Sequence, residues 1–249
     1  MKKIIFILSV HLVLFCRAES GFSNQFVTDF TAHSAKFADY EHTHLGFSVK
    51  NKFVKELNEL SLFAVCPTKI GIWGVEYALS SNFSVYEHSL QLAYIRSFSP
   101  RLAASFSFTA LLRHFERQVQ ANFNINTDIL LKINSYLHFT SSLRIPVRFH
   151  SYNRTDALAD AFLAVGLDYY PIKELLVKAE IQQDLFRLPT IRASVAYTFC
   201  KDFTVVASVE NRSFCGGFGY NHKKFQILLH CRYVQILGAE TKLIISYKF

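Results

Sequence analysis

The stretch Leu175-Leu176-Val177-Lys178-Ala179-Glu180-Ile181-Gln182-Gln183-Asp184 decides the fold. Apolar side chains occupy its odd positions as far as Ile181, whereas charged and amide side chains occupy the even positions after Leu176. Successive side chains of a β-strand point to opposite faces, so this period of two predicts a strand with one apolar and one polar face.

The same alternation recurs along the chain from about residue 42, in segments separated by short clusters of turn-forming residues. The predicted strands lie near 43–50, 59–67, 71–79, 88–98, 101–114, 122–132, 136–144, 160–170, 174–184, 190–200, 202–211, 214–221, 224–233 and 239–249. This makes about fourteen strands, and an even number allows an antiparallel meander to start and finish on the same side of a membrane.

The connections between these segments alternate between tight and longer ones. The tight ones hold the Pro, Asn, Asp and Ser residues that turns favour, at 67–69, 99–101, 170–173, 201–202 and 221–223. The intervening connections are mostly longer and lie at 51–58, 80–87, 115–121, 145–159 and 185–189. Short periplasmic turns and longer outward loops are typical of outer-membrane barrels.

Aromatic residues separate a membrane barrel from the main alternative, a secreted soluble β-sandwich. The chain holds 25 Phe and 12 Tyr, and several lie near the ends of predicted strands, at Tyr197, Phe199, Phe203, Tyr220, Phe225, Tyr233 and Tyr247. Aromatic rings form girdles at the two interfaces of a membrane barrel. We therefore predict an all-β fold, a transmembrane antiparallel β-barrel over residues 42–249.

The N-terminus predicts export. Lys2 and Lys3 precede an apolar run of about a dozen residues, and the small residue Ala18 follows at a plausible cleavage point, which is the arrangement of a secretory signal peptide. A retained anchor and a lipoprotein attached through Cys16 are the weaker alternatives. We predict a signal peptide at 1–18, a short periplasmic or plug segment at 19–41, and localisation in the bacterial outer membrane.

Two further stretches carry a family resemblance. Residues 48–57 (SVKNKFVKEL) and 62–77 (LFAVCPTKIGIWGVEY) resemble the opening hairpins of PorV/PorQ-type barrels of the Bacteroidetes, relatives of the FadL family. The resemblance implies transport of small hydrophobic molecules or an accessory role in type IX protein secretion. It also implies an N-terminal plug, in which residues 33–38 (HSAKFA) keep the alanines of the family segment but carry His33 in place of its asparagine.

The closing strand of the chain also resembles that of the family, and Tyr247 and Phe249 would form the C-terminal signal that the barrel-assembly machinery reads. The expected partners are outer-membrane lipids, this machinery, and either a small apolar ligand or secretion-system components.

Charge and motifs exclude other classes. The formal net charge is +8, and cleavage after Ala18 would remove Lys2, Lys3 and Arg17 to leave +5, with the remaining cations scattered singly. This spread gives no basic face for nucleic acid. Nucleotide-binding glycine loops, HExxH and paired zinc spacings are absent, so we predict no cofactor, no metal and no catalytic residue.

Three alternatives for individual side chains remain at this point. His42 and His44 could pair on a metal, although no third ligand lies near them in sequence. Ser194 or Ser208 with His230 could form a lipid-modifying enzyme site. The four cysteines beyond the signal peptide, Cys66, Cys200, Cys215 and Cys231, show no CxxC spacing and are expected to be isolated thiols.

The candidate functional residues are polar side chains of the inward strand faces. They are Lys178, Glu180, Gln182, Arg192, Glu210, Gln226, His230, Arg232 and Lys242. We expect the cations Lys178 and Arg192 to pair with Glu180 and Glu210 and to stabilise a closed barrel without transport; a narrow channel or a plugged interior is the alternative.

Overall fold

The computed structural model describes residues 13–18, 21–26, 34–51, 58–82, 85–115, 118–147, 161–184, 188–199, 202–211, 213–234 and 238–249. Within these ranges, no helix is long and apolar enough to cross a membrane.

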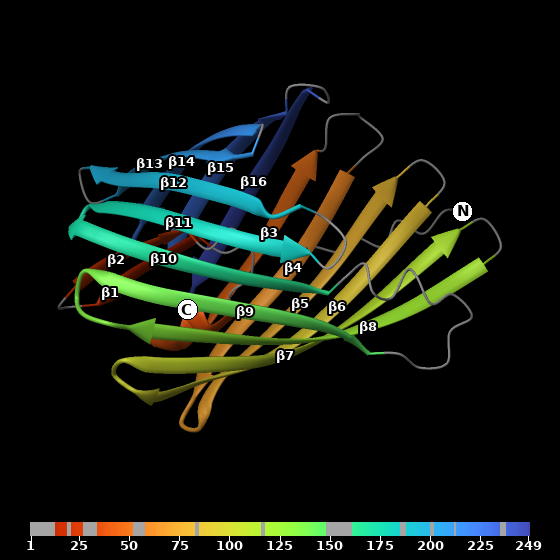
Figure 1. The fold of residues 1–249 in the computed structure, drawn as a ribbon, viewed down its shortest axis with the longest axis horizontal. Helices are drawn as coiled ribbons and strands as arrows, with labels where there is room; N and C mark the ends of the chain where they lie inside the picture. Colours follow the sequence, from red (N-terminus) through yellow and green to blue (C-terminus); the bar gives the residue numbers. More distant parts are fainter. Residues whose placement is uncertain are drawn as a thin grey trace.

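Fourteen antiparallel strands form one closed barrel (Figure 1). They are β3 (His44–Asn51), β4 (Asn58–Thr68), β5 (Gly71–Asn82), β6 (Val85–Ser99), β7 (Leu102–Phe115), β8 (Gln118–Lys132), β9 (Leu137–Val147), β10 (Phe162–Ile172), β11 (Leu175–Asp184), β12 (Thr190–Phe199), β13 (Phe203–Glu210), β14 (Ser213–His222), β15 (Phe225–Val234) and β16 (Gly238–Lys248). From β4 to β16 each strand pairs with the next in sequence, and β16 pairs with β3. At the remaining junction the Ser48 and Ser61 hydroxyls of β3 and β4 lie 3.1 Å apart.

Strand β10 shows how the alternation divides inside from outside. Ala164 and Asp168 are 1% and 0% exposed, whereas Leu163 and Leu167 between them are 45% and 44% exposed. Period two therefore places the small and polar residues in the barrel interior and the large apolar residues on its outer surface.

The outer surface is apolar around the barrel. Exposed leucine, isoleucine, valine and aromatic side chains occupy outward positions of each of the fourteen strands, among them Leu62, Leu92, Ile129, Val195 and Leu229. A soluble protein does not expose an apolar surface of this extent. The soluble sandwich is therefore wrong, and the predicted transmembrane barrel of about fourteen strands is confirmed.

Some predicted connections are shorter than expected. β5 and β6 are joined by residues 83–84 and β7 and β8 by residues 116–117, so the loops predicted at 80–87 and 115–121 are wrong in length. Polar residues such as Ser81 continue the strand ladder, because backbone pairing needs no apolar side chain. In the predicted 145–159 loop, residues 145–147 belong to β9, and residues 148–159 lie outside the described residues.

Three elements of the described residues precede the barrel, two strands and a short helix. Val13–Ala18 and Gly21–Phe26 form the antiparallel hairpin β1–β2, and β2 contacts β11 and β12. β1 falls within the predicted signal peptide, of which residues 1–12 lie outside the described residues, so that prediction stays untested.

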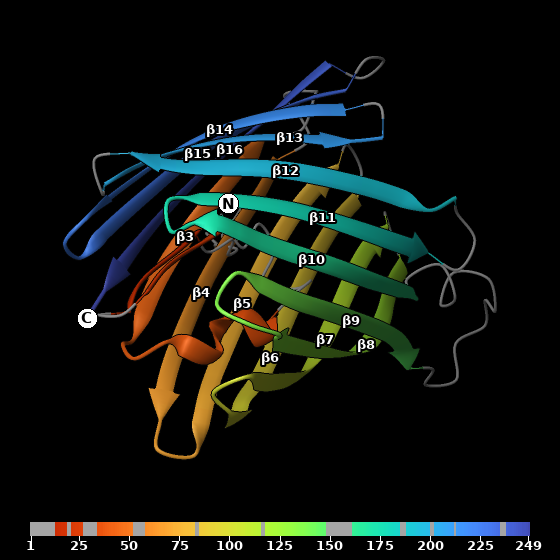
Figure 2. The ribbon, with the colours of Figure 1, turned by 60° about the vertical axis from the view of Figure 1, so that its left-hand side comes forward.

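The 3-10 helix η1 (Ser34–Asp39) lies inside the barrel at the end where the tight turns are (Figure 2). Its Ser34, Ala35, Lys36 and Phe37 are buried among inward side chains of the strands. Residues 34–39 thus lie in the barrel interior, within the segment 19–41 that was predicted as a plug. We refer to η1 as the plug helix.

Candidate functional site

An aspartate on β8 holds the start of the plug helix. Asp128 accepts hydrogen bonds from the Ser34 backbone N–H at 2.8 Å and from the Ser34 hydroxyl at 2.5 Å. The Ser105 and Ser142 hydroxyls also donate to it, at 2.7 and 2.5 Å. Asp128 is 2% exposed, and these donors satisfy a carboxylate that would otherwise be costly to bury.

The next contact joins the plug helix to β10, two strands along the same wall from β8. The Lys36 ammonium forms an ion pair with Asp168 of β10, and both side chains are almost completely buried. Burial lowers the pKa of Lys36, and the neighbouring carboxylate of Asp168 opposes that shift. The contact ties η1 to β10 as well as to β8.

Apolar packing adds a third contact between the plug helix and the barrel wall. Phe37 and Tyr40 join Phe63, Val65 and Ile95 in one buried cluster between the plug segment and strands β4 to β6. Phe37 and Tyr40 meet edge to face with ring centroids 5.1 Å apart. The plug helix is therefore packed against strands β4 to β6 at the turn end of the barrel.

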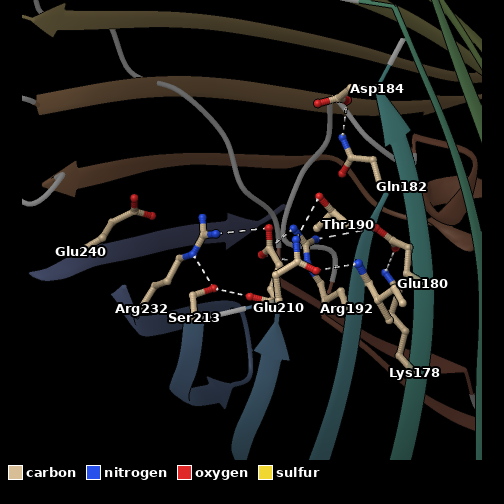
Figure 3. Close-up of polar contacts among 12 residues, drawn as sticks. Lys178, Glu180, Gln182, Asp184, Thr190, Arg192, Glu210, Ser213, Arg232 and Glu240 are labelled. Atoms are coloured by element: carbon tan, nitrogen blue, oxygen red, sulfur yellow. Dashed lines mark hydrogen bonds and ion pairs between the residues drawn. The ribbon is translucent and has the colours of Figure 1, made fainter. Parts of the chain in front are cut away.

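Charged residues line the wall toward the loop side, and their contacts run from strand to strand (Figure 3). Lys178 binds Glu180 at 2.6 Å within β11, and Arg192 of β12 lies 3.7 Å from the same carboxylate. Arg192 also binds Glu210 of β13 at 2.9 Å, and Arg232 of β15 binds Glu210 at 3.2 Å. The pairs expected between Lys178 or Arg192 and Glu180 or Glu210 are thus formed.

A cavity of about 120 Å³ lies beside this network. Its lining comprises Lys50, Lys178, Arg192, Ser194, Val206, Ser208, Glu210, Cys215, Leu228, His230, Arg232, Glu240, Lys242 and Ile244. Five of these side chains are cationic and two are carboxylates. Lys50 of β3 binds Glu240 of β16 at 3.0 Å.

Of the nine candidate residues predicted from the sequence, six line the cavity and three lie elsewhere on the inner face of the barrel. Lys178, Arg192, Glu210, His230, Arg232 and Lys242 line the cavity. Glu180 lies in the ion-pair network, Gln182 donates to Asp184 at 3.4 Å near the loop end, and Gln226 accepts from Ser246 at 3.0 Å near the turn end. The role of these side chains in acting on a solute remains a prediction.

The sequence analysis did not identify several residues that hold η1 or line the cavity. Lys50 and Glu240 lie on the polar faces of predicted strands, so the alternation could have identified them. Asp128 also lies on the polar face of a predicted strand, but its contact with Ser34 and the contact of Lys36 with Asp168 had no signal in the sequence, because only the fold places a segment before the first barrel strand against β8 and β10.

The structure also locates residues of the enzyme and metal alternatives. Ser194, Ser208 and His230 all line the cavity, so the fold brings together the residues of the hydrolase alternative. Within the described ranges, no three His, Cys, Asp or Glu residues are arranged to hold a metal ion. His44 stacks on Tyr40 with ring centroids 4.5 Å apart, which gives it a packing role.

Cys66, Cys215 and Cys231 are free cysteines. Cys66 and Cys231 occupy outward positions of β4 and β15, whereas Cys215 lines the cavity. Cys200 lies outside the described residues.

No protein-family model and no curated protein sequence matches the chain. It is similar in structure to the Pseudomonas putida toluene transporter TodX, with a TM-score of 0.64 and 10% identity over 88% of this chain and 92% of that one. The CymD monoaromatic hydrocarbon channel gives 0.58 and 11% over 84% and 89%, and the Acinetobacter baumannii outer membrane protein Omp33 gives 0.57 and 7% over 84% and 98%. At these identities the similarity concerns the fold alone. The chain has the closed barrel of outer-membrane channels, and its apolar outer surface agrees with a location in the outer membrane.

Proposed function

We propose that this protein is an outer-membrane channel that passes small solutes. The observation that carries the proposal is the cavity inside a closed barrel, lined by charged and hydroxyl side chains. A barrel with a purely structural role can fill its interior with packed side chains, whereas a polar cavity holds water and admits solutes.

Passage requires a movement at the turn end. Residues 34–40 pack inside the barrel there, held by the apolar cluster around Phe37 and by the contacts to Asp128 and Asp168. We therefore propose that the conducting state is reached when the plug segment shifts, and that the resting barrel conducts weakly.

Conductance of the purified full chain in planar bilayers tests this proposal. We expect small single-channel steps that grow when the contacts of the plug segment are weakened. Absence of any conductance, in the unchanged protein and in a plug-weakened variant such as Lys36→Met, would overturn it. A band that shifts on boiling before electrophoresis confirms that the tested protein is a folded barrel.

A narrower version of the function concerns the solute or partner. Passage of small apolar molecules is supported by the apolar floor of the cavity, formed by Val206, Leu228 and Ile244, and by the fold shared with TodX and CymD. The accessory role in type IX secretion, and membership of the PorV/PorQ or FadL relatives, are supported by residues 48–57 and 62–77. Liposome uptake of a small aromatic hydrocarbon tests the first, and co-purification with secretion components tests the second.

The hydrolase alternative has one observation in its favour, the meeting of Ser194, Ser208 and His230 at the cavity. Release of fatty acid from detergent-solubilised phospholipid tests it. Ser208→Ala and His230→Ala should abolish such activity, and a protein without activity contradicts this alternative while leaving the channel untouched.

A further inference from the structure

Two histidine side chains meet on the outer surface of the barrel, near its loop end. His88 is the fourth residue of β6, and His114 is the last but one of β7. Leu90 and Leu112, the next residues on the same faces of these strands, are exposed. Because alternate residues of a strand share a face, both imidazoles belong to the outer surface and not to the lumen.

The register of β6 and β7 makes these histidines diagonal neighbours. His88 lies directly opposite Leu112, and His114 lies directly opposite Tyr86, two positions away along each strand. Aromatic side chains at diagonal positions of an antiparallel pair are within reach of each other. The two ring centroids are 5.3 Å apart, and the ring planes are inclined by 75°.

This spacing fits a shared metal ion. A zinc ion lies about 2.0–2.1 Å from each ligating imidazole nitrogen and prefers a tetrahedral arrangement, which places the centroids of two ligating rings about 5 Å apart. The observed 5.3 Å between His88 and His114 agrees with that value. Binding therefore requires rotation of the two side chains and no shift of the strands.

Tyr77 of β5 orients one of the two rings. Its hydroxyl lies 2.7 Å from Nδ1 of His88. With the proton on Nδ1, His88 donates to the Tyr77 oxygen, and Nε2 keeps the lone pair that a metal ion needs. Histidines that bind metals in proteins almost always make such a bond to oxygen through their other ring nitrogen, which fixes the tautomer and the ring orientation.

We propose that His88 and His114 bind one zinc ion on the outer surface at the loop end, with Tyr77 as a positioning residue. Within the described ranges no three His, Cys, Asp or Glu residues are arranged for a metal, so this site has two protein ligands. Structural zinc sites have four, and the remaining positions here are left to water or another outside ligand. Binding is therefore exchangeable, and it does not depend on the proposed channel function.

Isothermal titration with zinc chloride tests the site in the full-length barrel, folded in detergent at about pH 7.5 and free of any histidine tag. We expect saturable binding, which His88→Gln and His114→Gln each weaken by a factor of about ten or more, because one imidazole remains. His222→Gln, the same change at an exposed histidine at the turn end of β14, is the matched control and should leave the affinity unchanged. Absence of zinc binding, or equal affinity in all these proteins, would overturn the proposal.

A second pair of measurements tests how the ion is held. Tyr77→Phe keeps both ligands but removes the bond to Nδ1, and it should weaken binding by a factor of about ten. Ligating imidazoles must be neutral, so zinc binding should disappear as the pH falls through about 6.5. Binding that persists at about pH 5 contradicts imidazole ligation, and an unchanged affinity in Tyr77→Phe contradicts the positioning role.

Stability gives an independent readout of the same site. A ligand that binds only the folded state stabilises it, so saturating zinc should raise the urea midpoint of the unchanged protein. The double variant His88→Gln/His114→Gln should show no such increase, while its band still shifts on boiling as that of a folded barrel does. An equal increase in both proteins would show that zinc binds elsewhere and would contradict the site.

Discussion

Lys36 of the plug helix and Asp168 of β10 form an ion pair in which the two side chains are 4% and 0% exposed. The pair joins a segment that precedes the barrel to a strand in the opposite half of the chain. Removal of one partner leaves the other charge buried, at a cost of about 3–5 kcal/mol. This contact is therefore the first one to change in order to release the plug segment.

Lys36→Met should loosen residues 34–40 and raise the single-channel conductance, because Asp168 then lies buried beside an apolar side chain. The double variant Lys36→Met/Asp168→Leu should recover much of the resting conductance, since it removes both charges. Lys132→Met, which breaks the more exposed pair with Asp39, is the matched control and should cost less than about 1 kcal/mol. Equal conductance in Lys36→Met and Lys132→Met would contradict this role of the buried pair.

Gly46→Ala should destabilise the barrel near its β3–β4 junction. An added Cβ at Gly46 would lie 2.1 Å from a ring carbon of Phe63 and 2.8 Å from the Ile245 carbonyl oxygen, and the oxygen belongs to rigid backbone. Overpacking of this kind costs about 1–3 kcal/mol. Gly216→Ala is the control, because nothing lies within 4 Å of its added Cβ. Unfolding in urea can be measured by heat-modifiable migration on a gel. We expect a lower urea midpoint for Gly46→Ala than for the unchanged protein, and no change of the midpoint for Gly216→Ala.

Val195→Lys should destabilise the folded barrel in lipid by about 2–4 kcal/mol, the cost of a lysine on the lipid face near the middle of the membrane. Val195 lies in the middle of β12 and is 44% exposed on the outer surface. Val195→Leu keeps the surface apolar and should change the free energy of unfolding by less than about 0.5 kcal/mol. If both variants unfold at the same urea concentration, the outer surface of β12 does not face lipid.

Phe249→Ala should reduce assembly in cells without weakening the finished barrel. The Phe249 ring is 58% exposed and meets Tyr247 with centroids 4.8 Å apart, while its backbone N–H donates to the Thr43 carbonyl oxygen at 2.9 Å, a bond that alanine keeps. We propose that the barrel-assembly machinery recognises Tyr247 and Phe249, and we therefore expect a lower membrane yield in vivo and an unchanged yield on refolding in detergent. Phe214→Ala, at another exposed ring, serves as the control. A loss that appears equally in detergent would indicate a packing role instead.

Alternation alone predicted the strands, since the side-chain period of a strand is a local property that a short stretch such as 175–184 displays fully. It also indicated the inward face, and six of the nine candidates do line the cavity. The lengths of the β5–β6 and β7–β8 connections were misjudged, because polar residues beyond the apolar zone still form backbone ladders.

The sequence by itself determined a barrel of about fourteen strands and the residues that point inward, because both depend on neighbours along the chain. Tertiary structure decided which inward residues meet. Closure of β16 on β3 sets Lys242 opposite Lys50, and the fold of residues 34–39 into the lumen sets Lys36 against Asp168. Both pairings join residues more than a hundred positions apart, so they depend on barrel register and on packing of the interior, which no local pattern encodes.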